Sequence, residues 1–136
     1  MHVPQSFRCK SILALLFLCF SIEGFAKDER FACNVDEFIT SDKSPTDFVK
    51  SNQRKVFFVT VGETEITVKP NYDKFRIVGR TGEKVAGYSF YDMDNDILST
   101  SIDTIIFDLE AAAGVISFSH IQYPSANNWL LKCVKE

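Results

Sequence analysis

The chain contains 136 residues, of which 46% are hydrophobic, 24% are charged and 13% are aromatic, and its formal net charge is −3. This length suits one domain and excludes a multidomain enzyme. The ordinary hydrophobic content and the moderate charge exclude a chain that is disordered throughout. We therefore expect a single small folded domain.

Residues 1–26 have the three-part layout of a secretory signal peptide. A weakly basic start precedes the apolar run Ile12–Phe20, and the small residue Ala26 stands at the expected cleavage site. As a helix the run would rise about 14 Å, which is too short for a hydrocarbon core of about 30 Å. The pattern predicts a domain over 27–136 that is secreted or periplasmic, with a retained membrane anchor as the alternative.

Two cysteines remain in that domain, Cys33 and Cys133, and they lie near its two ends. In an oxidising compartment such a pair is expected to form a disulfide. The bond requires the two Cα atoms to lie within about 7 Å, so the first and last strands must be neighbours. Two buried free thiols are the alternative. A metal site is disfavoured because no Cys-x-x-Cys or histidine spacing accompanies the pair.

One short helix is predicted after the first strand. Ser44 can cap it, Pro45 suits the first helical position, and Asp47 stands where a capping box has its acidic residue. The helix should end near Gln53.

Most of the remaining chain alternates apolar and polar residues as strands do, with turn signals between the segments. The predicted strands are Arg30–Ile39, Lys55–Val61, Thr64–Lys69, Lys74–Gly79, Val85–Tyr91, Ile102–Leu109, Val115–Tyr123 and Trp129–Lys135. About eight strands with one short helix predict a mostly β fold, either a small antiparallel β-barrel or a β-sandwich, closed by the terminal disulfide. Parallel α/β folds are excluded because the chain has no crossover helices. The disulfide favours the barrel slightly.

One hairpin can be predicted in register. A two-residue loop at residues 62–63 would place Val59 opposite Ile66, so that the apolar side chains of both strands share one face.

Charge is distributed unevenly along the domain. Residues 27–85 carry eleven basic and ten acidic side chains, whereas residues 86–136 carry two and seven. This argues against nucleic acid and anionic lipid as partners, since both require concentrated lysine and arginine. It weakly favours a cationic partner. The alternative is a solvated surface whose charge keeps the protein soluble.

The most distinctive local pattern is acidic. Asp92, Asp94, Asp96 and Asp103 match the spacing of the oxygen ligands in an EF-hand calcium loop. However, Ile97 stands where that loop needs glycine, and the twelfth position holds the shorter aspartate. The four aspartates are candidate Ca²⁺ ligands, and a connector rich in Asx turns is the alternative. No other cofactor is indicated.

Catalysis is not indicated. The predicted domain has one histidine, His120, and the neighbouring Ser117 and Ser119 alternate to the opposite face of the same strand. No Gly-x-Ser-x-Gly sequence is present. We therefore expect a protein that is not an enzyme.

These features together favour an exported, non-enzymatic binding protein that acts on another protein, such as an inhibitor or a toxin-neutralising protein. Phe90, Tyr91 and Trp129 are the candidate binding surface. Neither nucleic acid nor, once the signal is removed, a membrane is an expected partner.

The alternative function is that of a carrier for a small apolar ligand, held in a barrel or between two sheets. Its cavity would be lined by residues such as Tyr88, Phe107 and Phe118.

Overall fold

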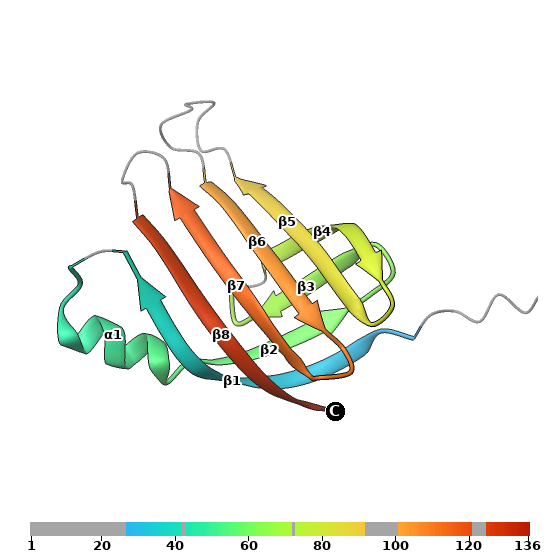
Figure 1. Ribbon diagram of the computed structural model, residues 1–136, viewed down its shortest axis with the longest axis horizontal. Helices are drawn as coiled ribbons and strands as arrows, with labels where there is room; N and C mark the ends of the chain where they lie inside the picture. Colours follow the sequence, from blue (N-terminus) through green and yellow to red (C-terminus); the bar gives the residue numbers. More distant parts are fainter. Residues whose placement is uncertain (1–26, 42, 72, 92–100, 121–124) are drawn as a thin grey trace, which may run out of the picture.

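The computed structural model describes residues 27–41, 43–71, 73–91, 101–120 and 125–136. Eight antiparallel strands form a closed barrel in which each strand pairs with the next and the last pairs with the first (Figure 1). The mostly β fold is confirmed, and the barrel rather than the sandwich is correct. None of the helices in these ranges is long and apolar enough to cross a membrane.

The predicted strands are all present, with bounds shifted by a few residues at most. In chain order the elements are β1 (Glu29–Thr40), α1 (Thr46–Gln53), β2 (Val56–Val61), β3 (Glu65–Lys69), β4 (Asp73–Thr81), β5 (Lys84–Tyr91), β6 (Ser101–Asp108), β7 (Ala113–His120) and β8 (Ser125–Lys135). The predicted signal segment 1–26 lies outside the described residues.

Alternation along each strand separates the inside of the barrel from the outside. On β6, Ile105 and Phe107 are fully buried, while Ile106 between them is exposed. On β1 a bulge interrupts the alternation at Asp36, which has no cross-strand partner on β8. The extra residue allows Phe38 to face inward, although it is an odd number of positions from the inward Cys33.

The interior is filled by side chains. The largest fully buried ones are Phe31, Phe75, Phe107, Ile66, Ile105, Ile116, Val59, Val68, Val85 and Cys33. The rings of Phe31 and Phe107, from opposite parts of the chain, lie with their centroids 4.8 Å apart. Burial of these side chains is the main favourable contribution to folding.

The two ends of the chain are joined as predicted. Cys33 and Cys133 are direct cross-strand partners on β1 and β8, and they form a disulfide with a Cα–Cα distance of 3.9 Å. The N–H of Glu136 donates to the carbonyl oxygen of Arg30 at 2.9 Å and continues the pairing to the end of the chain.

The β2–β3 hairpin is confirmed, but its predicted register is wrong. The loop lies one residue further along the chain, and the N–H of Gly62 donates to the carbonyl oxygen of Glu65 at 2.9 Å. Val59 therefore pairs with Val68 instead of Ile66. Because side chains alternate with a period of two, both registers bury the same face.

The helix α1 is also present, but its predicted cap is wrong. Pro45 occupies the N-cap position, and no side chain caps the helix. The carbonyl oxygen of Pro45 accepts hydrogen bonds from the N–H groups of Phe48 (2.9 Å) and Val49 (3.2 Å). The helix thus begins after the proline, and Ser44 lies outside the capping position.

α1 covers a gap in the barrel wall. β2 begins at Val56, opposite Asn34, so the second half of β1 pairs only with β8. α1 lies beside that half of β1 (Figure 1), and the ring of Phe48 packs edge-on against Phe38 with a centroid distance of 5.8 Å.

Gly114 is required for packing. It lies opposite Phe107, and a Cβ atom at this position would lie 2.6 Å from Cδ2 of that ring and 2.8 Å from the carbonyl oxygen of Ile106. Gly114→Ala should therefore lower the free energy of unfolding by about 1–3 kcal/mol, measured by chemical denaturation. Gly79→Ala is the matched control, because nothing lies within 4 Å of a Cβ atom there. Equal losses in the two variants would contradict this packing.

The disulfide should supply much of the stability. Its cysteines are separated by 100 residues. For a loop of this size, Cys33→Ala/Cys133→Ala should lose about 4–5 kcal/mol of unfolding free energy. Denaturant titration of the variant and of the oxidised and reduced protein tests this, since the reduced protein should resemble the variant. A loss below about 1 kcal/mol would show that the disulfide contributes little.

Candidate functional site

The predicted binding residues lie in different places. Phe90 lies on the outer face of β5 and is 58% exposed. Tyr91 is the last residue of β5, but its side chain lies outside the described part of the structure. Of these two residues, only Phe90 can be compared with the prediction, and it is on the surface.

Trp129 is not part of an exposed binding surface. It is 5% exposed and faces inward from β8, where its ring lies 5.1 Å, between centroids, from each of Phe38 and Phe118. The Lys55 ammonium lies 5.3 Å from the centre of the indole ring. Pairing with β1 and β7 turns this residue into the barrel, so it belongs to the core. Its indole N–H has no hydrogen-bond partner in the described structure.

Phe90 belongs to a larger apolar surface, which we call the outer patch. It consists of Tyr88 and Phe90 on β5 and of Ile102 and Ile106 on β6, all of them exposed. The two strands are neighbours, and Phe90 pairs directly with Ile102. Large apolar side chains gathered on adjacent strands are typical of an interaction surface.

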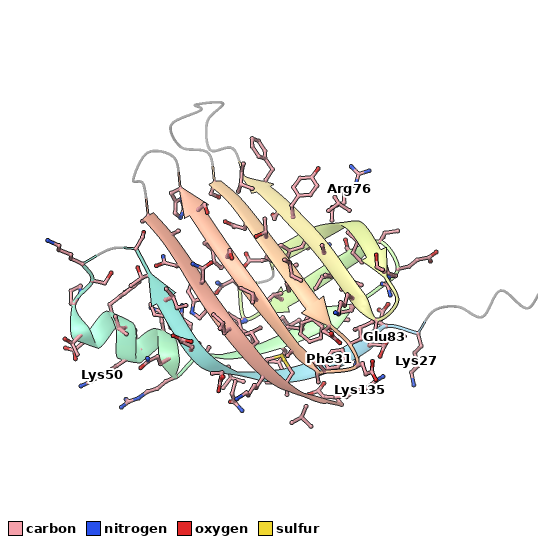
Figure 2. All side chains as sticks on the ribbon, viewed as in Figure 1. Lys27, Phe31, Lys50, Arg76, Glu83 and Lys135 are labelled. Carbon is pink, nitrogen blue, oxygen red and sulfur yellow. A yellow bond between two sulfur atoms is a disulfide. The ribbon has the colours of Figure 1, made fainter. Side chains whose placement is uncertain are left out.

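The edges of the outer patch differ in chemistry. On the β4 side, Arg76 pairs with Tyr88, and Figure 2 shows its side chain beside β5. On the other side, a shallow hollow of about 480 Å³ begins at Ile106 and continues over Val115 and Leu130. Charged side chains surround this hollow, so the apolar surface has a polar rim.

The second notable feature lies inside one end of the barrel. The last residues of β5 and β7 and the first residues of β6 and β8 meet there (Figure 1), and Asp73 at the start of β4 lies close enough to influence Asp103. Unlike the rest of the interior, this end carries polar side chains. We call them the mouth cluster: Asp73, Ser101, Asp103, His120 and Asn127.

Cross-strand pairing places these side chains on the inner face. Asp103 and Asn127 each pair with the inward-facing Phe118, from either side of β7. His120 pairs with the buried Ser101. Asp73, on β4, pairs with the buried Val68.

Asp103 has an unusual environment. It is 9% exposed, and its Oδ1 atom is buried with no hydrogen-bond partner in the described residues. Burial and the nearby Asp73 carboxylate raise the pKa of Asp103 to about 6, although His120 and a hydrogen bond from the Ser119 backbone lower it. Burial also raises the pKa of Asp73, against a hydrogen bond from Asn71 that lowers it. Two partly desolvated carboxyl groups thus face one space.

The predicted calcium site stays a prediction, because three of its four candidate ligands lie outside the described residues. Asp92, Asp94 and Asp96 lie outside the described residues. Asp103 lies within β6 and points into the barrel. Among the residues that can be placed, no group of three or more histidine, cysteine or acidic side chains could hold a metal ion.

The predicted carrier lining is not brought together. Phe107 is fully buried and Phe118 faces inward beside Trp129, but Tyr88 lies on the outer face of β5. These residues therefore do not line a common cavity.

The serines near His120 lie on the opposite face of β7, as expected. The hydroxyl of Ser117 donates to Oδ1 of Asn128 at 2.6 Å on the outer wall. His120 faces the mouth, so these groups do not form a nucleophile–base pair.

Sequence reasoning placed only Asp103 of the mouth cluster in a candidate site, and it assigned that residue to a calcium loop. Asp73 and Asn127 were missed. The available signal was the alternation on β6, where Ser101, Asp103, Ile105 and Phe107 share one face. Recognising the cluster also required knowing which strand ends meet, and no local pattern contains that information.

Comparison with known proteins adds no further evidence about the site. No family model matches the sequence, and neither a characterised protein nor a solved structure matches it.

Asp103 should make stability depend on pH. Its pKa is about 6 in the folded protein and ordinarily 3.8, so between these values the folded state binds more protons than the unfolded state. The wild type therefore loses stability as pH rises through this range, and Asp103→Asn should lose less, because only Asp73, whose pKa is also raised, still contributes. The unfolding free energy of the variant minus that of the wild type should increase by about 1–3 kcal/mol between about pH 4 and pH 7. A difference that is constant with pH would contradict the burial of this carboxyl group.

Proposed function

We propose that this protein is an exported, non-enzymatic binding protein that acts on another protein through the outer patch. The observation that carries the proposal is the exposure of Tyr88, Phe90, Ile102 and Ile106 on two neighbouring strands. Such side chains cost free energy in water and recover it when a partner covers them. Aromatic residues in particular supply large contact areas at little cost in conformational entropy.

The surroundings of the patch suit protein recognition. Arg76 at one edge and the charged rim of the hollow at the other provide polar contacts around an apolar centre. The strands are part of a closed, disulfide-locked barrel, so little backbone freedom is lost on binding. A rigid surface of this kind is favourable for an inhibitor or for a protein that neutralises a toxin.

The disulfide supports export. Disulfides persist in oxidising compartments and are rare in the cytosol, and residues 1–26 have the pattern of a secretory signal. We propose that the protein is secreted or periplasmic and meets its partner there.

Site-specific photocrosslinking tests the contact surface. A benzophenone amino acid replaces Ile106, which is 61% exposed in the outer patch, and separately Val134, which is 70% exposed on β8 and serves as the matched control. In the native compartment, the probe at Ile106 should form one discrete protein adduct that Val134 does not form. Adding the Phe90→Ser substitution should reduce the yield of that adduct several-fold, because it removes another large apolar side chain of the outer patch.

The same adducts from both positions, or none from Ile106, would overturn the proposed surface. Circular dichroism of each variant confirms that the barrel is intact before the comparison.

A further inference from the structure

Polar side chains occupy inward positions at the barrel mouth, where burial is costly. On β6, Ser101 and Asp103 continue the same inner face that Ile105 and Phe107 fill with apolar side chains. A carboxyl group taken out of water without full hydrogen bonding is unfavourable. In barrels, the mouth is also a preferred place for a ligand. The departure from an apolar interior therefore indicates a binding role.

The mouth presents hydrogen-bond acceptors that have no donor among the described residues. The Oδ1 atoms of Asp103 and Asn127 are both buried and unpartnered within the described structure. They come from β6 and β8, and each residue pairs across the sheet with Phe118 on β7. Both oxygens thus belong to the same row of the inner face. A ligand that satisfies them must carry N–H or O–H donors.

Two carboxyl groups in the mouth cluster favour a positively charged ligand among those that carry such donors. Asp73 adds a second carboxyl group close enough to influence Asp103. His120 also faces this end, and it is the one basic side chain in the mouth cluster. With both carboxyl groups ionised, a bound cation relieves their mutual repulsion and replaces the water that they have lost.

Aromatic side chains lie beside these acceptors and deeper in the barrel. Phe118 lies in the same row, and Trp129, the next inward residue on β8, packs edge-on against it at 5.1 Å between ring centroids. This combination suits a cation that carries a short alkyl chain, because the chain contacts the rings while the charged head reaches the acceptors.

We propose that the barrel mouth binds an alkylammonium or alkylguanidinium group, with Asp103 and Asn127 accepting hydrogen bonds from its head and Asp73 completing the negative charge. This chemistry is shared by free amines and by the side chains of lysine and arginine. The site is distinct from the outer patch, so this proposal can be tested independently of the proposed protein partner.

The test is a nuclear magnetic resonance titration of the oxidised protein with n-butylguanidinium and n-butylammonium. 1-Butanol serves as the uncharged control with the same alkyl chain. Both cations should cause saturable shifts of the backbone amide signals of Ser101, Asp103, His120 and Asn127, whereas butanol should not. The absence of saturable shifts, or equal shifts with butanol, would overturn the proposal.

Two matched variants show whether the carboxyl group is responsible. Asp103→Asn should weaken binding of the cations about tenfold or more, because it removes a charge-assisted hydrogen bond. Asp108→Asn changes another aspartate of β6, whose Oδ1 accepts a hydrogen bond from the Ala111 N–H (2.9 Å) outside the mouth cluster, and should leave affinity unchanged. Equal affinity in the wild type and Asp103→Asn would overturn the assignment.

A third variant protects the test against misfolding. If Asp103→Asn does not fold, Asp73→Asn replaces the half-buried carboxyl group at the edge of the mouth, and it should weaken binding several-fold. Unchanged affinity in this variant would overturn the role of Asp73.

A final comparison identifies the source of the cation. Butylguanidinium is compared with the blocked tripeptide Gly-Arg-Gly. Binding of both supports a side chain of a partner protein as the ligand, and binding of butylguanidinium alone supports a free amine. Binding of neither overturns the proposal, whatever the outcome of crosslinking at the outer patch.

Discussion

The pairing of β1 with β8 is the constraint on which the rest of the structure depends. These strands lie at the two ends of the described domain, and nine residue pairs hold them together, with the Cys33–Cys133 disulfide among them. Without this ladder, both strands would present unpaired backbone groups at the edges of an open sheet. The disulfide limits the entropy that the unfolded chain can gain by separating its ends. The closed barrel is therefore stabilised in two ways: by the hydrogen bonds between β1 and β8, and by the lower conformational entropy of the disulfide-linked unfolded chain.

Closure also decides where function can reside. An eight-stranded barrel has an interior just wide enough to be filled by side chains, and here aromatic and branched residues fill it. The remaining surfaces are the outer wall, where β5 and β6 expose the outer patch, and the mouth, where the filling changes from apolar to polar.

Local sequence patterns predicted the elements well, because alternation and turn residues act over a few positions. They could not decide between barrel and sandwich, since both bury one face of each strand. The β2–β3 register was predicted wrongly for a similar reason. A register with Val59 opposite Ile66 and one with Val59 opposite Val68 bury the same side chains, so the pattern of burial does not distinguish them. The disulfide was predictable because only two cysteines follow the predicted signal.

Residues whose position depends on distant strands were predicted less well. Trp129 follows a polar segment, which favoured an exposed rim, but its inward direction is set by pairing with β1 and β7. Asp103 lies inside β6, within a segment predicted as a strand, but that prediction did not reveal which other side chains face it. Asp73 comes from β4, two strands away, and its charge influences Asp103 because both side chains face the inside of the curved barrel. The mouth cluster is thus a property of topology that alternation alone does not reveal.

The most direct measurement of closure is the nuclear Overhauser effect between α-protons of β1 and β8. The short Cα–Cα distance of 3.9 Å identifies Cys33 and Cys133 as a pair whose α-protons face each other. The barrel predicts strong cross-peaks between these two α-protons and, two residues along each strand, between those of Phe31 and Lys135. If β1 and β8 showed no such cross-peaks while β6 and β7 did, the strands would form an open sheet, and the account of a closed barrel would be wrong.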